Sequence, residues 1–133
     1  MLIGQVTDTN SGWMARNLRP YGWKTKSVKV VGDDAKEIEK GIDEAFDQTD
    51  VVLMTGGLGP TKDDITKSTL CEYFGGEMVL DEATLLNVEE VLNKRGLTMN
   101  DLNHNQAMVP SSCRVIQNRV GTAPLMWFEK DDK

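Results

Sequence analysis

The sequence is poor in the residues that build multi-histidine metal sites and disulfide frameworks. Its 133 residues include one histidine, His104, and two cysteines, Cys71 and Cys113. A single histidine excludes a site with several histidine ligands. The two cysteines lack the spacing of a metal site, so we expect reduced thiols. A hard cation held by oxygen ligands remains compatible with this composition.

Long apolar runs and an excess of positive charge are also missing. No run of about 18 apolar residues is present, which argues against a membrane span. The N-terminus lacks the basic and apolar segments of a signal peptide. We therefore expect a cytoplasmic protein without a membrane partner. The net charge of −6 argues against a nucleic-acid partner, because nonspecific binding to phosphates needs a basic face.

The most informative stretch spans residues 51–66, with the sequence VVLMTGGLGPTKDDIT. Residues 51–54 form a short apolar run that predicts a buried strand, and a helical pattern begins near residue 64. Glycines between them let peptide N–H groups approach a ligand, and a helix N-terminus attracts an anion. The order of residues matches neither a Walker loop nor the G-x-G-x-x-G fingerprint. The expected ligand contacts are Gly56, Gly57, Leu58, Gly59, Pro60, Thr61 and Thr66.

Two adjacent carboxylates, Asp63 and Asp64, follow these glycines. They would repel a phosphate unless a divalent cation bridged them to it, or unless one of them positioned a water molecule or a hydroxyl group. A simpler alternative is that the glycines only form a turn and that an aspartate only caps the next helix.

Residues 24–31, 35–48 and 51–54 predict a strand, a helix and a second strand, which together form a βαβ unit. Ligands of open parallel sheets bind beyond the carboxyl ends of the strands. Asp33 follows the first strand, so we expect it on the same edge of the sheet as the glycine loop. The alternative is that Asp33 or Asp34 caps the helix that follows.

The remaining pattern predicts further helices and strands. We expect Trp13 and Trp23 in the core, although an exposed face carrying both could hold a dimer. Asp8, Thr9, Asn10 and Ser11 are candidate helix caps, with Asn10 also a candidate ligand contact. The expected helices cover about residues 9–19, 64–74, 82–95 and 97–108, and the expected strands cover 77–80, 114–117 and 125–129.

Taken together, these segments resemble the CinA-type (competence/damage-inducible) proteins and the wider molybdopterin-binding-domain superfamily. The resemblance rests on residues 55–66 and extends to residues 2–10, 31–34, 105–110 and 118–124. It implies an α/β fold: a three-layer α/β/α sandwich around a mostly parallel sheet. Members of the family carry additional sequence before residue 2 and beyond residue 133. We therefore expect residues 1–133 to be a single domain that is incomplete at both ends.

The resemblance also implies a function. In the CinA branch the domain is associated with metal-dependent hydrolysis of ADP-ribose to AMP and ribose 5-phosphate. In the other branch it holds molybdopterin for adenylylation or metal insertion, and a third possibility is nucleotide binding without turnover. The implied catalytic and cation-binding residues are Asp64, Asp63 and Asp33, and the implied additional ligand contacts are Gly121, Thr122 and Pro124. The expected partners are a nucleotide or pterin ligand and, in a homo-oligomer, further copies of the chain.

Overall fold

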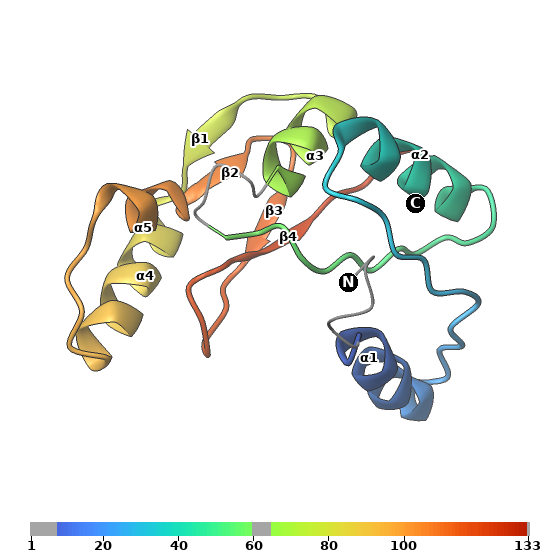
Figure 1. Ribbon diagram of the computed structural model, residues 1–133, viewed down its shortest axis with the longest axis horizontal. Coiled ribbons are helices and arrows are strands. Elements are labelled where there is room, and N and C mark those ends of the chain that lie inside the picture. The colour runs from blue at the N-terminus through green and yellow to red at the C-terminus, as the bar shows by residue number, and fades with distance from the viewer. Residues whose placement is uncertain (1–7, 60–64, 133) are drawn as a thin grey trace. The chain divides into compact units, whose positions relative to one another are not determined.

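The computed structural model describes residues 8–59 and 65–132 and contains both helices and strands (Figure 1). The chain divides into two compact units, residues 1–55 and residues 56–133. Each unit has its own helices, so the two are described separately. In the described residues no helix is both long enough and apolar enough to cross a membrane.

The first unit contains helix α1 (Asn10–Leu18), the short 3-10 helix η1 (Arg19–Tyr21) and helix α2 (Ala35–Phe46). The Asp8 carboxylate accepts a hydrogen bond from the backbone N–H of Ser11 at 3.1 Å, which satisfies one of the free donors at the start of α1. Gly22 ends η1 with a φ of +86°. Both predicted helices of this unit are confirmed.

Helix α2 begins with a reciprocal cap. The Asp34 carboxylate accepts from the backbone N–H of Glu37 at 3.1 Å, and the Glu37 carboxylate accepts from the backbone N–H of Gly32 at 2.8 Å. Such pairs satisfy backbone donors on both sides of a helix start. The predicted apolar stripe is confirmed in part, because Ile38 and Ile42 are buried.

The predicted strands at residues 24–31 and 51–54 are not strands in the structure. A strand needs a neighbouring backbone for its N–H and C=O groups, and neither segment belongs to a sheet. Apolar side chains of both segments are exposed, among them Val28, Val30 and Leu53. The apolar pattern was therefore insufficient here, and the predicted βαβ unit is wrong for the described residues.

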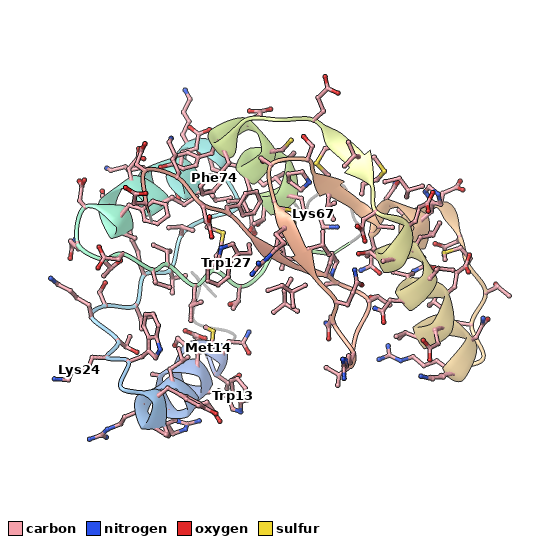
Figure 2. All side chains as sticks on the ribbon, turned by 180° about the vertical axis from the view of Figure 1, so that it is seen from behind. Trp13, Met14, Lys24, Lys67, Phe74 and Trp127 are labelled. Atoms are coloured by element: carbon pink, nitrogen blue, oxygen red, sulfur yellow. The ribbon has the colours of Figure 1, made fainter. Side chains whose placement is uncertain are left out.

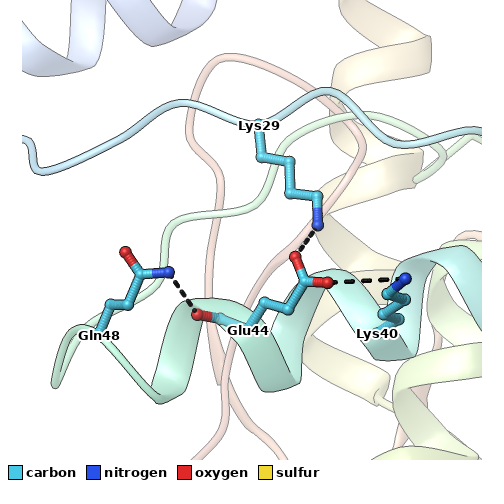
Figure 3. Close-up of polar contacts among 4 residues, drawn as sticks. All are labelled: Lys29, Lys40, Glu44 and Gln48. Atoms are coloured by element: carbon cyan, nitrogen blue, oxygen red, sulfur yellow. Dashed lines mark hydrogen bonds and ion pairs between the residues drawn. The ribbon is translucent and has the colours of Figure 1, made fainter.

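Polar contacts and close packing hold segment 24–31 against α2 instead. The Lys29 ammonium pairs with the Glu44 carboxylate, and Lys40 approaches the same carboxylate at 3.8 Å (Figure 3). Gly41 allows Val31 to pack closely, because a Cβ at Gly41 would lie 3.0 Å from Val31 Cγ1. The charged groups are half exposed, so this ion pair contributes little to stability.

Trp13 and Trp23 are not core residues. Trp13, on α1 (Figure 2), is 61% exposed and Trp23 is 52% exposed. Helix α1 has no buried residue at all. The expected burial of these two tryptophans is therefore wrong.

In residues 56–59 and 65–132, the second unit combines three helices with two small sheets. Strands β1 and β2 pair antiparallel with Val79 opposite Val109, and strands β3 and β4 pair antiparallel with Val115 opposite Met126. The mixed α/β class is confirmed, whereas the pairing seen in the described residues is antiparallel. The elements are α3 (Thr66–Phe74), β1 (Met78–Leu80), α4 (Glu82–Lys94), α5 (Asp101–Asn105), β2 (Met108–Pro110), β3 (Arg114–Ile116) and β4 (Leu125–Trp127).

The core of this unit lies where α3, α4 and β2 supply apolar side chains. Phe74, at the end of α3, adds a stacked contact with Phe128 at 4.5 Å between ring centroids. Burial of such side chains is the main source of stability of a domain. The buried apolar residues of the unit are Leu70, Cys71, Val88, Val91, Leu92, Ala107 and Val109.

Strand β2 was not predicted. The sequence suggested one helix over residues 97–108, but α5 ends at Asn105 and residues 108–110 pair with β1. Val109 precedes Pro110, and a residue before proline disfavours helical backbone. The proline therefore marks a strand in this segment as well as the end of a helix.

Candidate functional site

The described part of the glycine loop comprises residues 56–59. Gly56 and Gly57 have φ values of +100° and +62°, which favour glycine. A Cβ added at Gly57 would lie 2.1 Å from Thr66 Oγ1. The loop backbone therefore lies directly against the first residue of α3, and Gly57 is required both by its conformation and by its neighbour.

Helix α3 starts without a side-chain cap from its N-cap residue, which is Ile65. An isoleucine side chain has no acceptor, whereas most helices use Ser, Thr, Asp or Asn at this position. The Ile65 carbonyl oxygen accepts hydrogen bonds from the backbone N–H of Thr69 at 3.0 Å and from its hydroxyl at 2.9 Å. The predicted residues Pro60, Thr61, Asp63 and Asp64 lie outside the described residues.

The second predicted loop, residues 118–124, is held by two asparagines. Asn118 Nδ2 donates to the carbonyl oxygen of Ala123 at 2.9 Å, and its Oδ1 accepts from the backbone N–H of Val120 at 3.0 Å. Asn87 Nδ2, on α4, donates to the carbonyl oxygens of Asn118 and Gly121 at 2.9 and 3.2 Å. These bonds fix the backbone of this glycine-bearing loop, within which Gly121 and Thr122 are half-buried and Pro124 is fully buried.

A cavity of about 320 Å³ opens beside this loop, between α4 and Arg119. Lys94 and Glu90, both in its wall, form an ion pair at 2.6 Å. The hydrogen bond with Lys94 lowers the pKa of Glu90. The cavity is lined by Asn87, Glu90, Val91, Lys94 and Arg119.

Lys67 is a buried lysine that follows Thr66 on α3. Its side chain lies in the interior of its unit, in contrast to that of Lys24, which projects outward (Figure 2). The ammonium donates to the carbonyl oxygens of Gln106 at 2.7 Å and Met108 at 3.1 Å. Burial lowers the pKa of Lys67, and the Cys113 thiol nearby acts in the opposite direction.

A second polar cluster joins the start of α4 to the end of β3. The Asp81 carboxylate accepts from the backbone N–H of Thr84 at 2.7 Å and from Gln117 Nε2 at 3.2 Å. Gln117 Nε2 also contacts Thr84 Oγ1 at 3.1 Å. The hydrogen bonds from Thr84 are the main reason that the pKa of Asp81 is lowered.

Two predicted site residues, Asn10 and Asp33, belong to the first unit. Asn10 is the exposed first residue of α1. Asp33 is exposed as well, and Asp34, the other candidate, is the residue that caps α2. The Asp33 carboxylate has no partner within residues 8–59 and 65–132, so it is available for another role.

No three His, Cys, Asp or Glu side chains of the described residues lie close enough together to hold a metal ion. Asp63 and Asp64, two of the three predicted ligands, fall outside the described residues. The third, Asp33, offers a free oxygen ligand of the kind that hard cations prefer. The predicted cation site therefore stays a prediction.

Sequence reasoning missed Lys67 and Asn87, which organise the surroundings of the two glycine loops. A signal for Lys67 was present: it stands three and four residues before the buried Leu70 and Cys71, on the inward face of the helix. Asn87 gave no such signal, because an asparagine within a helix usually faces solvent.

Comparison with known proteins shows strong similarity along the whole chain. The profile of a family described as "Probable molybdopterin binding domain" matches residues 1–132. A CinA-like protein of Cytophaga hutchinsonii is 50% identical over 129 residues, which are 97% of this chain and 31% of that protein. A CinA-like protein of Flavobacterium psychrophilum is 44% identical, over 99% of this chain and 32% of that protein.

A solved structure is similar as well. It is titled as the crystal structure of the protein CinA, with unknown function, from Thermoplasma acidophilum. Its TM-score is 0.83 at 32% identity, and the match covers 99% of this chain and 77% of the solved one. The chain thus spans about a third of the length of the two CinA-like proteins and most of this solved chain.

Proposed function

The chain belongs to the family of CinA-like proteins with a molybdopterin-binding-type domain, and on this basis we propose that it hydrolyses the pyrophosphate bond of ADP-ribose. Water would add to one phosphorus atom, the bond between that phosphorus and the bridging oxygen would break, and AMP and ribose 5-phosphate would leave. The observation that carries the proposal is the glycine loop packed against an α3 start that its N-cap residue cannot cap.

The loop supplies what a pyrophosphate needs for binding. Gly56 and Gly57 adopt positive φ values. Because they have no side chains, a phosphate can approach their backbone closely. The positive end of the α3 dipole adds to the attraction. Preorganised donors of this kind stabilise charge that develops on phosphate oxygens during the reaction. Leu58, Gly59, Pro60 and Thr61 would continue this wall, and Thr66 would offer its hydroxyl.

Asp64, with Asp63, would hold a divalent cation. When bound, such a cation offsets phosphate charge and lowers the pKa of a coordinated water. Asp64 would also orient the attacking water. On sequence grounds, Asp33 is proposed as a third ligand of this cation and Asn10 as a ligand contact. Gly121, Thr122 and Pro124 are proposed as the wall contributed by the second loop.

The test is release of AMP from ADP-ribose, measured by chromatography with added Mg²⁺ or Mn²⁺ and in the presence of a chelator. We expect AMP and ribose 5-phosphate in equal amounts, and only with the cation. ADP-ribose left intact under all conditions would contradict the hydrolase proposal.

A second candidate is molybdopterin binding with adenylyl transfer, which the description of the matching family favours. It would use nearly the same residues, because a pterin phosphate suits the same loop. Incubation with molybdopterin and ATP would then yield an adenylylated pterin. A third outcome, saturable nucleotide binding without product in either assay, would identify a regulatory binding module.

A further inference from the structure

We propose that Lys67 is a positioning residue for the nucleotide site, and that its buried ammonium sets where the glycine loop lies within its unit. The inference rests on the proposed function, since it assigns a task toward that same ligand. Lys67 is not itself expected to touch the ligand, because its ammonium is turned toward two backbone carbonyls.

The glycine loop is in close contact with the start of α3. Thr66 Oγ1 occupies the place where a side chain at Gly57 would begin, so Gly57 and Thr66 cannot move independently. Thr66 is buried, as is Lys67, which follows it on the same helical turn. Any displacement of Lys67 therefore displaces Thr66 and the loop in contact with it.

The Lys67 ammonium is hydrogen-bonded to a well-satisfied stretch of backbone. Three consecutive carbonyls just before and within β2 are all bound: those of Gln106 and Met108 by the Lys67 ammonium, and that of Ala107 by the backbone N–H of Asp81 at 3.0 Å. This segment is itself fixed by the pairing of β2 with β1. Lys67 thus links α3 to a backbone segment whose carbonyls are all hydrogen-bonded.

Burying the Lys67 ammonium costs free energy. A buried ammonium near a helix N-terminus is unfavourable both through desolvation and through the helix dipole. An apolar side chain of similar length would fill the same space without either cost. An apolar side chain would pack in the same space but would form no directional hydrogen bonds to the two carbonyls. The lysine therefore fixes the orientation of α3 relative to β2 in a way that an apolar side chain would not.

The experiment compares Lys67→Met with Lys67→Arg and with Lys40→Met, an exposed lysine on α2 that loses the same charge. Circular dichroism first establishes that each variant is folded at the assay temperature. Calorimetry then gives the dissociation constant for ADP-ribose. We expect Lys67→Met to weaken binding by about tenfold or more, Lys40→Met to leave it unchanged, and Lys67→Arg to restore part of the loss because it keeps the donors.

Hydrogen exchange supplies a readout that does not depend on any ligand. We expect faster amide exchange in peptides covering residues 56–59 and 104–109 of Lys67→Met, but not of Lys40→Met. A folded Lys67→Met that binds ADP-ribose like the wild type, or exchanges like it in residues 56–59, would overturn the inference alone. Failure of the wild type to bind ADP-ribose would overturn the proposed function, while the exchange result would still decide whether Lys67 positions the loop.

Discussion

At the scale of single residues, Gly57 carries the strictest requirement in the site. Its φ of +62° disfavours any side chain, and the Thr66 hydroxyl occupies the space that a Cβ would need. Gly96 provides a matched comparison, because its φ is +68° but nothing lies within 4 Å of its Cβ position. Substituting alanine at each of the two glycines therefore separates the effect of backbone strain from the effect of packing.

We predict that Gly57→Ala weakens ADP-ribose binding by about tenfold or more, because Thr66 and the loop must move apart. It should also lower the free energy of unfolding by more than Gly96→Ala, for which only strain of about 1–2 kcal/mol applies. Urea denaturation and calorimetry measure both quantities. Equal losses of stability in the two variants, with unchanged affinity, would show that the contact with Thr66 is unimportant.

Residue roles were predictable from the sequence where they depend on local chemistry. Asp34 was one of two candidates for the cap of α2, and the structure selects it because its carboxylate reaches the N–H of Glu37. Lys67 was not predictable in this way. Its partners, Gln106 and Met108, lie about forty residues further along the chain, and no local pattern indicates a contact at that separation.

At the scale of elements, the start of α4 depends on Asp81, which accepts from Thr84 and from Gln117. The pKa of Asp81 is lowered in the folded protein, chiefly by the hydrogen bonds from Thr84. A lowered carboxyl pKa stabilises the fold above the unfolded pKa, and this contribution is lost as the pH falls through the folded value. The contribution of the α4 cap to stability should therefore decrease as the pH falls and Asp81 becomes protonated.

We predict that Asp81→Asn flattens the loss of stability as the pH falls below the ordinary aspartate pKa of about 4, because its amide oxygen keeps the cap without titrating. Asp81→Ala should cost about 1 kcal/mol at neutral pH, since it removes the cap altogether. Urea midpoints at a series of pH values test both statements. An Asp81→Asn variant with the same acid dependence as the wild type would rule out this carboxylate as the source.

Helices were easier to predict than strands for a physical reason. A helix satisfies its own backbone, so a cap and an apolar stripe such as Ile38 and Ile42 are enough to identify α2. A strand depends on a partner elsewhere in the chain. Residues 24–31 and 51–54 have apolar strand patterns without a sheet, whereas Val109, at the end of a polar segment, pairs with Val79.

At the scale of the whole molecule, the family and the α/β class could be inferred from the sequence, since the segment at residues 55–66 is specific. The positions of the site residues relative to one another could be inferred only in part. Gly57 and Thr66 are in contact as expected for one loop, while Asn10 and Asp33 belong to the other unit. The expected place of Asp33 beside the glycine loop relied on a parallel sheet through residues 24–31 and 51–54, which those segments do not form.

The exposed tryptophans lead to a prediction for the assembled protein. We expect a homo-oligomer whose contact includes the exposed Trp13 and Trp23, because large aromatic side chains are enriched at interfaces. Sedimentation should show a mass above that of one chain, and replacing both tryptophans by serine should shift it toward the monomer. A wild-type chain that sediments as a monomer at all concentrations would contradict the expectation.

Hydrolysis of ADP-ribose is tested most directly by comparing the wild-type chain with Asp64→Asn and measuring the AMP released with a divalent cation. Because the proposed cation site and the oriented water both depend on the Asp64 carboxylate, we predict cation-dependent AMP release by the wild type and none above background by Asp64→Asn. Circular dichroism should show the same fold for both. Undiminished AMP release by a folded Asp64→Asn would contradict the role of Asp64, and no release by the wild type would contradict the proposed hydrolysis of ADP-ribose.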